Sequence, residues 1–514
     1  MVQLSLTIST ICIALLLRYL VSRFPHSGQD RPPLFGDYEA QRHWMEITIN
    51  FKPTEWYKNS TDNDLQYWGL DYPPLTAYHM LFSGVVSNLF NASWTELHHS
   101  RGMDSYEHKL FMRSTVLISD LMSFMPAVIY YFSQTSSQSS VVKLNHQQQQ
   151  PTPDHSVNNF LFTIFALIYP AQILIDHGHF QYNCVFMGLV IWAVILVGRQ
   201  RYLSASLIFS LALNYKQMSL YYSLSFFWYL LSVTIRRRPI SRAIFQLATI
   251  SLTVLITFII CWSPFLDNPN TALQVLKRLF PFDRGLFEDK VANIWCSLSV
   301  VFKFKQIYSL EQLLRISTLL TLAFSLPSGI HLLMAPSFQS FRYSLINCSL
   351  VFFLTSFQVH EKTILVVAVP ILLVFREHIT TVNWFVLIST FSLQPLMVKD
   401  QLMIPYAALL IIYAVFSTEC FRASIVPEID QTFNLQMFMR YIYFISCIGA
   451  VTLNLAAMLI SPPPRYPDLH PLLNAIYSCV HFIGFLAFFY YKQFKCSSDM
   501  YSRSSSSPTK DKSD

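Results

Sequence analysis

The stretch AIFQLATISLTVLITFIICW, residues 243–262, decides the fold class. It carries no charged side chain and has the length of about 20 residues that a helix needs to cross the hydrocarbon core of a bilayer. Several other runs are shorter, which favours broken or non-spanning helices around a shielded cavity. Apolar runs of this kind predict about 14 membrane helices, at 1–22, 112–133, 157–175, 184–198, 202–214, 217–235, 243–262, 312–335, 343–357, 363–375, 381–394, 402–417, 439–460 and 470–491.

The composition of the 514-residue chain supports the same class. Hydrophobic residues make up 53% and charged residues only 13%, about half of the roughly 25% charge of a soluble domain. A water-soluble globule of this size could not cover its surface with so little charge. The net charge of +7 is spread along the chain and forms no nucleic-acid-binding patch. The prediction is therefore an all-α polytopic membrane protein with the lipid bilayer as its partner.

Nine cysteines and twelve glycines exclude two further classes of site. The cysteines mostly lie within apolar runs and form no CxxC pair, so they are typical of small buried side chains and not of a metal site or a disulfide framework. The scarcity of glycine argues against a glycine-rich loop that would hold a nucleotide phosphate.

The apolar runs and the polar segments between them divide the chain into eight parts. We expect a first span at 1–22, a long catalytic loop at 23–111, a span at 112–133, a Gln-rich linker at 134–156, a bundle at 157–262 with a short loop at 176–183, a loop at 263–311, a second bundle at 312–491, and a disordered tail at 492–514. The polar linker and tail cannot bury a core.

Basic residues in the short connections predict the orientation. They gather at 199–201, 236–242, 376, 422 and 492–495, on the side that would also hold both termini, so this side should be cytosolic. The opposite, lumenal side then receives the loops at 23–111, 176–183, 263–311, 358–362 and 461–469. Glycosylation sequons at Asn59 and Asn91 fall in the first of these loops and require a lumenal position. The end of the tail, residues 510–514, is similar to a cytosolic dilysine signal for retrieval to the endoplasmic reticulum.

The first lumenal loop contains the most unusual polar sequence. GDYEAQRHWME at 36–46 and QYWGLDYPPLT at 66–76 combine tryptophan, tyrosine and carboxylates. Flat aromatic faces beside hydrogen-bond acceptors suit carbohydrate recognition, whereas the alternative is an interfacial aromatic belt with solvated acids.

Three smaller polar clusters lie on the same predicted side: DHGHFQYN at 176–183, FPFDRGLFEDK at 280–290 and FQVHEKT at 357–363. Ionisable residues at the ends of spans are costly unless solvated or paired, which makes them site candidates. His177 and His179 lack a third ligand at a defined spacing for zinc, and each could equally be a hydrogen-bonded packing residue. The Asp-x-Asp pattern at 62–64 has no nucleotide-binding βαβ unit beside it, so we interpret it as a solvated turn and expect no metal site.

Taken together, GDYEAQRHWMEIT at 36–48, the segment 67–76, DHGHFQYN at 176–183, FEDKVAN at 287–293 and HEKT at 360–363 resemble one family. It is the dolichyl-phosphate-glucose-dependent glucosyltransferases of the endoplasmic reticulum, which have the class C membrane glycosyltransferase fold with lumenal loops that carry short helices. The resemblance covers residues 30–370 or so. Within the family, the 36–44 form resembles the branch that adds the first α-1,3-glucose to the lipid-linked high-mannose oligosaccharide. The alternative is the sister branch that adds the second glucose.

The resemblance implies dolichyl-phosphate-glucose as donor, dolichyl-diphosphate-linked oligosaccharide as acceptor, inversion by a single displacement, and no cofactor. The family's catalytic carboxylate maps onto Asp37. One base suffices, because the departing phosphate ester is already a stable anion, whereas glycosidases need a second carboxyl group to protonate their leaving group. The phosphate needs positive charge or hydrogen-bond donors beside it, for which we expect His360, Lys362 and Arg284. The residues expected to bind substrate are Asp71, Glu288, His177, His179 and Trp68.

Two further interpretations remain open from the sequence. Arg42 and His43 could either orient groups in the site or be structural partners of Asp37. A transporter would place its ionisable residues inside the helices of two similar halves, and a non-catalytic scaffold in glycan assembly would tolerate loss of Asp37.

Overall fold

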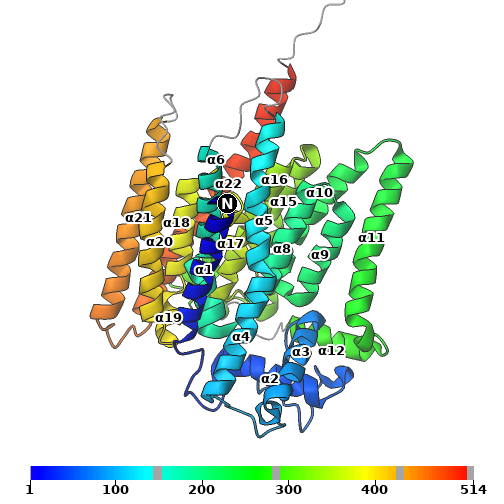
Figure 1. Ribbon diagram of the computed structural model, residues 1–514, viewed down its shortest axis with the longest axis vertical. Coiled ribbons are helices and arrows are strands. Elements are labelled where there is room, and N and C mark those ends of the chain that lie inside the picture. Colours follow the sequence, from blue (N-terminus) through cyan, green and yellow to red (C-terminus); the bar gives the residue numbers. More distant parts are fainter. Residues whose placement is uncertain (1, 143–152, 281–289, 424–432, 506–514) are drawn as a thin grey trace, which may run out of the picture.

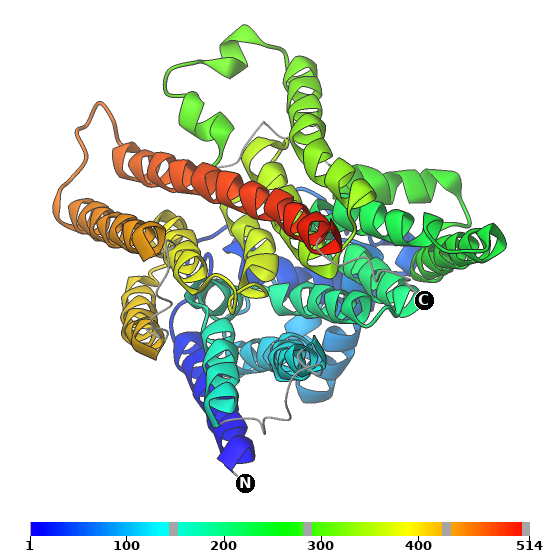
Figure 2. The ribbon, with the colours of Figure 1, turned by 90° about the horizontal axis from the view of Figure 1, so that it is seen from above.

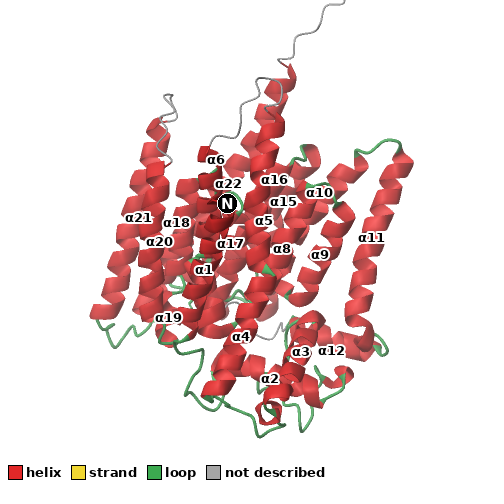
Figure 3. Cartoon of the chain, viewed as in Figure 1, coloured by secondary structure: helices red, strands yellow, loops and turns green. Residues whose placement is uncertain are grey.

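The computed structural model describes residues 2–142, 153–280, 290–423 and 433–505. Throughout these ranges the regular structure is helical and contains no strand (Figure 3). Up to residue 262 the chain forms α1 (Val2–Ser22), α2 (Gly36–Asn50), η1 (Pro53–Glu55), α3 (Pro74–Phe90), η2 (Ala92–Thr95), α4 (Tyr106–Met122), α5 (Phe124–Val142), α6 (Pro153–Leu167), α7 (Pro170–Ile173), the π-helix η3 (Leu174–Phe180), α8 (Asn183–Gly198), α9 (Tyr202–Tyr215), η4 (Gln217–Tyr222), α10 (Ser223–Ile235) and α11 (Ile240–Trp262).

The remainder of the chain continues the helical bundle. It forms η5 (Ser263–Phe265), α12 (Pro269–Leu279), α13 (Ile294–Leu298), α14 (Phe304–Ile307), α15 (Leu310–Met334), α16 (Phe338–Thr355), η6 (Glu361–Thr363), α17 (Ile364–Leu372), α18 (Ile379–Phe391), α19 (Gln394–Lys399), α20 (Met403–Ala423), α21 (Phe433–Leu459) and α22 (Leu469–Ser505).

Eight helical stretches in the described ranges are long and apolar enough to cross a membrane: Tyr106–Gln134, Phe160–Phe180, Gln217–Ile235, Ile240–Phe265, Leu310–Met334, Ile379–Lys399, Phe438–Leu459 and Leu469–Cys496. Four shorter apolar helices accompany them, at Leu6–Ser22, Asn183–Gly198, Tyr202–Tyr215 and Met403–Ser417. The prediction of an all-helical polytopic membrane protein is confirmed at this level.

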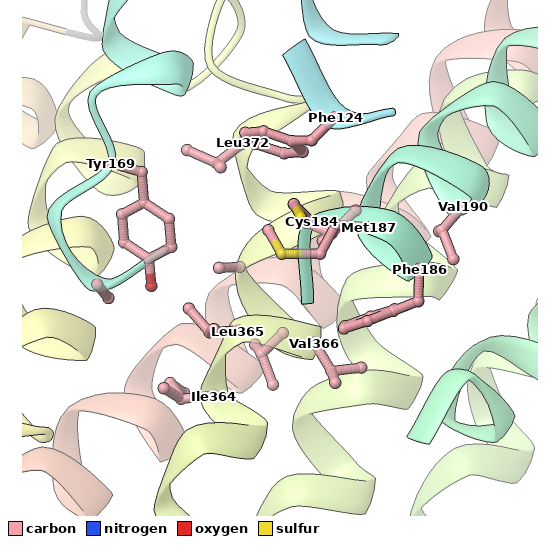
Figure 4. Packing of buried hydrophobic residues seen from close by; sticks show 14 of the residues in the cluster. Phe124, Tyr169, Cys184, Phe186, Met187, Val190, Ile364, Leu365, Val366 and Leu372 are labelled. Atoms are coloured by element: carbon pink, nitrogen blue, oxygen red, sulfur yellow. The ribbon is translucent and has the colours of Figure 1, made fainter. Parts of the chain in front are cut away.

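The core of the bundle lies around α8 and α17. Every residue of α17 is buried, and Figure 4 shows Val366 of α17 next to Phe186 of α8, with Ile364 and Leu365 on the side of Tyr169. A helix that is apolar on all sides belongs in such a core. By contrast, only 22% of the most apolar window of α11 and 11% of that of α21 are buried. These two helices lie at opposite edges of the molecule (Figures 1 and 2), where their apolar faces would meet lipid.

The helices α2, α3 and α12 lie together at one end of the bundle, and α1 runs toward this end (Figure 1). Toward the opposite end, α5 extends to Val142 and α6 begins at Pro153, so helices occupy part of the expected linker 134–156. Likewise α22 continues to Ser505, so a helix occupies the start of the tail 492–514 that the sequence predicted to be disordered. Residues 143–152 and 506–514, which include the segment 510–514, lie outside the described residues.

Candidate active site

Asp37 lies in the first turn of α2, directly after Gly36, whose backbone packs closely against the segment of Gly28. Gly28 and Gly36 have φ of 69° and 71°, and a Cβ on Gly36 would lie 2.6 Å from the backbone carbonyl carbon of Ser27. Only glycine combines this conformation with so close an approach. The two glycines thus fix the entry into α2, and the positive end of the helix dipole favours the carboxylate of Asp37.

Three side chains from two distant segments converge on Oδ2 of Asp37. Lys362 Nζ donates to it at 2.5 Å, Gln181 Nε2 donates at 2.6 Å, and His179 Nε2 lies 3.1 Å away. Lys362 Nζ also lies 3.0 Å from His179 Nε2. Oδ1 accepts no hydrogen bond from the described residues, and the Asp37 side chain is 23% exposed, so one carboxylate oxygen is left for another partner.

A second carboxylate stands behind His179. Asp400, just after α19, has its Oδ2 atom 2.5 Å from His179 Nδ1 and is buried. The His179 ring is therefore clamped between Asp37 and Asp400, and a ring protonated on both nitrogens would donate to both carboxylates. We refer to Asp37, His179, Lys362 and Asp400 as the Asp37 cluster.

The π-helix η3 holds His179 in place. Arg113 of α4 donates to the carbonyl oxygens of His177 at 2.7 Å and Gly178 at 2.8 Å. The backbone N–H of Ser27 donates to the His179 carbonyl at 3.0 Å. Isolated π-helical turns are rare and often occur at functional sites, and here the turn is held by side-chain and backbone donors from other segments.

Opposing effects set the pKa of Asp37. Burial acts to raise the pKa of its carboxyl, but the charge of Lys362, followed by the charge and hydrogen bond of His179, holds that pKa well below its ordinary value. Asp37 is consequently a carboxylate with low basicity while Lys362 remains beside it.

His360 lies at the edge of the Asp37 cluster, as the N-cap of η6. Its Nδ1 accepts from the backbone N–H of Lys362 at 3.3 Å, and its side chain is 27% exposed. Burial, and then the charge of Lys362, holds the pKa of His360 well below its ordinary value. A neutral ring that accepts at Nδ1 carries its proton on Nε2.

The family model described as "ALG6, ALG8 glycosyltransferase family" matches residues 11–488. The chain belongs to this family. The family assignment made from the motifs is confirmed, and the match extends beyond the segment that carried the resemblance. The transporter and scaffold interpretations lose their ground, because the family is one of glycosyltransferases.

The chain is similar to curated relatives over nearly its whole length. It is similar to the dolichyl pyrophosphate Man9GlcNAc2 alpha-1,3-glucosyltransferase of Gallus gallus, with 42% identity over 94% of this chain and 96% of the relative. The probable enzyme of the same name from Dictyostelium discoideum is 44% identical over 95% of each chain. That from Arabidopsis thaliana is 39% identical over 96% of this chain and 91% of the relative.

In this member of the ALG6, ALG8 family, Arg42 and His43 do not contact Asp37. They face a separate buried cluster, in which Arg42 pairs with Glu39 at 2.6 Å and Glu46 at 2.7 Å, and His43 lies 3.1 Å from Glu46. Burial would raise the pKa of Glu46, but the bond from His43 and the charge of Arg42 lower it to about 2. This cluster anchors α2 and leaves Asp37 to other partners.

His177 and His179 point to different neighbours although one residue separates them. His177 Nε2 lies 2.9 Å from Asp120 of α4, and Asp120 also accepts from Arg18 at 2.6 Å. Thus His179 belongs to the Asp37 cluster, whereas His177 belongs to a buried ion-pair network between α1 and α4.

The remaining predicted residues are dispersed. Trp68 is half-buried, and its indole N–H donates to the carbonyl of Leu34. Asp71 is half-buried near the start of α3, and its carbonyl accepts from Gln217 at 3.1 Å. Asn59 and Asn91 are exposed. Arg284 and Glu288 lie outside the described residues.

Sequence reasoning missed Asp400 and Lys216. Lys216 follows α9, and its ammonium donates to Asn183, which in turn donates to Gln181 Oε1 at 2.9 Å. Lys216 is a charged residue between apolar runs, and so is Asp400, which follows Lys399. Ionisable residues at such positions are site candidates, as they were at His360 and Lys362.

Proposed function

We propose that this chain transfers glucose from dolichyl-phosphate-glucose to a dolichyl-diphosphate-linked Man9GlcNAc2 oligosaccharide and forms the first α-1,3-glucosidic bond. The observation that carries the proposal is near-full-length similarity to relatives named for an alpha-1,3-glucosyltransferase acting on dolichyl pyrophosphate Man9GlcNAc2. A membrane-embedded helical bundle suits two substrates that are both anchored by long isoprenoid chains. No nucleic acid is involved in this reaction.

The finer architecture and location form part of the same proposal. The long and short apolar helices, together with the buried helices α16 and α17, make up the set of about 14 spans expected for a class C fold. The connection between α10 and α11 carries Arg236, Arg237 and Arg238 and lies at the end opposite α2 (Figure 1). By the positive-inside rule that end is cytosolic, which would put Asp37 on the lumenal face of the endoplasmic reticulum membrane.

In the proposed reaction, Asp37 is the general base. The acceptor mannose 3-hydroxyl attacks C1 of glucose, the bond between C1 and the phosphate oxygen breaks, and the hydroxyl proton passes to Asp37. Dolichyl phosphate leaves as an anion and needs no proton from the protein. Attack from the face opposite the β-linked phosphate gives the α-linked product in one displacement. Oδ1 of Asp37, which accepts no hydrogen bond from the described residues, is the oxygen that would receive the proton.

Lys362 and His360 would hold the donor phosphate, and Lys362 then has two anionic partners. As the phosphate draws Lys362 from Asp37, the charge that depresses the pKa of Asp37 weakens. The base therefore gains proton affinity only when the donor is bound. His179 retains its bonds to both carboxylates in this arrangement and would keep Asp37 oriented.

The sugar itself would be recognised by groups beside the cluster. Asp71 and Glu288 would supply hydrogen-bonding groups and Trp68 an aromatic face, while Arg284 would add positive charge near the phosphate. His177, which the sequence offered for the same role, is buried in its pair with Asp120 and is left out of this set. These assignments rest on the family resemblance; Trp68 and Asp71 lie in the connection between α2 and α3.

The test uses the purified full-length chain with both lipid substrates. We expect one glucose to be added, α-1,3-linked, to the Man9 acceptor, whereas addition only to an acceptor that already carries one glucose would favour the sister reaction. Asp37→Asn should lower turnover by about 10²–10⁴-fold with donor binding largely intact. Asp62→Asn, an exposed carboxylate of the same loop (57% exposed), is the matched control. Near-normal turnover of Asp37→Asn would contradict the role of Asp37.

A further inference from the structure

A cavity of about 170 Å³ lies where α1 ends and α4 begins. Four of its lining residues are the cationic side chains Arg18, Arg23, Lys109 and Arg113, and none of its lining residues is acidic. The cavity is distinct from the Asp37 cluster, because no member of that cluster lines it.

The charges around this cavity do not balance. Arg18 is neutralised by Asp120, at 2.6 Å, but Arg23, Lys109 and Arg113 form no ion pair with any residue in the described ranges. Arg23 donates to the Tyr106 hydroxyl at 3.4 Å, and Lys109 donates to Gln29 at 3.0 Å. Asp104 lies 3.2 Å from His26 and does not line the cavity; its charge acts on Lys109 and Arg113 from beyond ion-pair distance.

Arg113 makes this imbalance costly. Its side chain is only 5% exposed, its terminal nitrogens bond to backbone carbonyls, and its Nε has no hydrogen-bond partner. A buried guanidinium without a counter-charge is strongly unfavourable. Three cations that form no ion pair with the described residues thus line one cavity, and one of them, Arg113, is buried with an unused donor. This lining suits an anion of more than one charge.

The surroundings of the cavity indicate an anion with a hydrocarbon tail. On α1, Leu16 and Leu20 are 55% and 48% exposed; on α4, Leu110 and Ile118 are 45% and 55% exposed. Both helices therefore present apolar side chains outward on either side of the cationic opening, as membrane helices do toward lipid acyl chains. Cationic side chains at the end of such helices attract lipid phosphates.

We propose that this cavity binds the headgroup of a membrane lipid that carries a phosphate monoester or diphosphate. The phosphate would lie against Arg23, Lys109 and Arg113, with the lipid chain along the outer faces of α1 and α4. The same Arg113 holds the carbonyls of His177 and Gly178, so the bound headgroup would brace the π-helix from the side opposite the Asp37 cluster. The inference does not depend on glucosyl transfer.

The test measures lipid retention by the purified full-length protein. Native mass spectrometry would be run with phosphatidate, dolichyl phosphate and, as the neutral-headgroup comparison, phosphatidylcholine. The double variant Arg23→Gln/Lys109→Gln removes two unpaired cations that the fold does not use in ion pairs. Lys58→Gln/Arg465→Gln removes two exposed cations elsewhere and is the matched control, and thermal melting confirms that all proteins are folded.

We expect wild type and control to retain phosphatidate, dolichyl phosphate or both in preference to phosphatidylcholine, and the double variant to bind them about 10-fold or more weakly. Preference for one of the two phosphate lipids would identify the lipid backbone and support the proposal. Equal retention by the double variant and the control would overturn it. Displacement of the lipid by millimolar inorganic phosphate would also overturn it, because the site would then recognise free phosphate.

Discussion

Lys362 Nζ lies 2.5 Å from Asp37 Oδ2, although 325 positions separate the two residues in the chain. The contact joins the first turn of α2 to the short turn η6 between α16 and α17. It places a cation against the proposed base and depresses the pKa of that carboxyl. The motif of Asp37 and the motif of Lys362, which lie far apart in the sequence, are thus joined by one ion pair.

Removing the charge of Lys362 should move the acid limb of the pH profile. In the wild type the pKa of Asp37 is held well below its ordinary value, so Asp37 stays ionised until the pH is low. In Lys362→Gln the raising effect of burial is less opposed, the pKa of Asp37 rises, and activity should fall off at higher pH than in the wild type. The profile of kcat/KM against pH, which reports the free enzyme, measures this shift. Lys362→Arg keeps the charge and should keep the limb near its original position; an unmoved limb in Lys362→Gln would contradict the coupling.

His360 should act on the donor more than on the acceptor. One N–H bond to a charged phosphate contributes about 1.5–3 kcal/mol, so His360→Ala should raise the KM for dolichyl-phosphate-glucose by roughly 10- to 100-fold. His360→Gln, which retains an N–H donor, should recover part of the loss. Initial rates at varied donor and fixed acceptor, and the reverse, separate the two substrates. An equal effect on both KM values would remove His360 from the phosphate site.

The sequence predicted the helical membrane class because 20-residue apolar runs have one solution in a bilayer. The positions at which helices break were harder to predict from the sequence. The run 112–133 contains the end of α4 and the start of α5, with Ser123 between them. A Cβ on Gly188 of α8 would lie 2.5 Å from the Ser123 carbonyl carbon, so a tertiary contact accompanies this break, and hydropathy carries no record of it.

Within the site, the sequence predicted which loops meet but not which atoms. The motifs of His179, Lys362 and Asp37 were placed on one side by charge and apolar runs. Whether His177 or His179 faces Asp37 depends on the π-helical turn, and no sequence pattern predicted that turn. Asp400 was missed because a single acid between two apolar runs has no motif around it, and only packing brings it to His179.

Asp400 should act through His179 as a positioning residue. Asp400→Asn keeps the shape and an acceptor oxygen but removes the charge opposite Asp37, which frees the imidazole to change its protonation or orientation. Loss of such a supporting partner typically costs 10–100-fold at a metal site, and we expect a fall in kcat of about that size here with little change in donor KM. Asp468→Asn, at a carboxylate that is 66% exposed, should leave kcat unchanged. A rise in donor KM without a fall in kcat would instead indicate a role in phosphate binding.

The exposed sequons provide a test of the proposed orientation. Asn59 and Asn91 are exposed in the segment that contains α2 and α3, whereas Asn347 is buried in α16 and donates to Gln493 at 2.8 Å. If the α2 end is lumenal, Thr61→Ala and Ser93→Ala should each remove one glycan and increase gel mobility by one step in protein expressed in eukaryotic cells. Ser349→Ala disrupts the buried sequon and should leave the mobility unchanged, because an acceptor inside the bundle is inaccessible to the transferring enzyme. Endoglycosidase treatment should bring all forms to one mobility. Unchanged mobility of both exposed-sequon variants would leave the α2 end without support for a lumenal position, and a shift with Ser349→Ala would contradict the burial of Asn347.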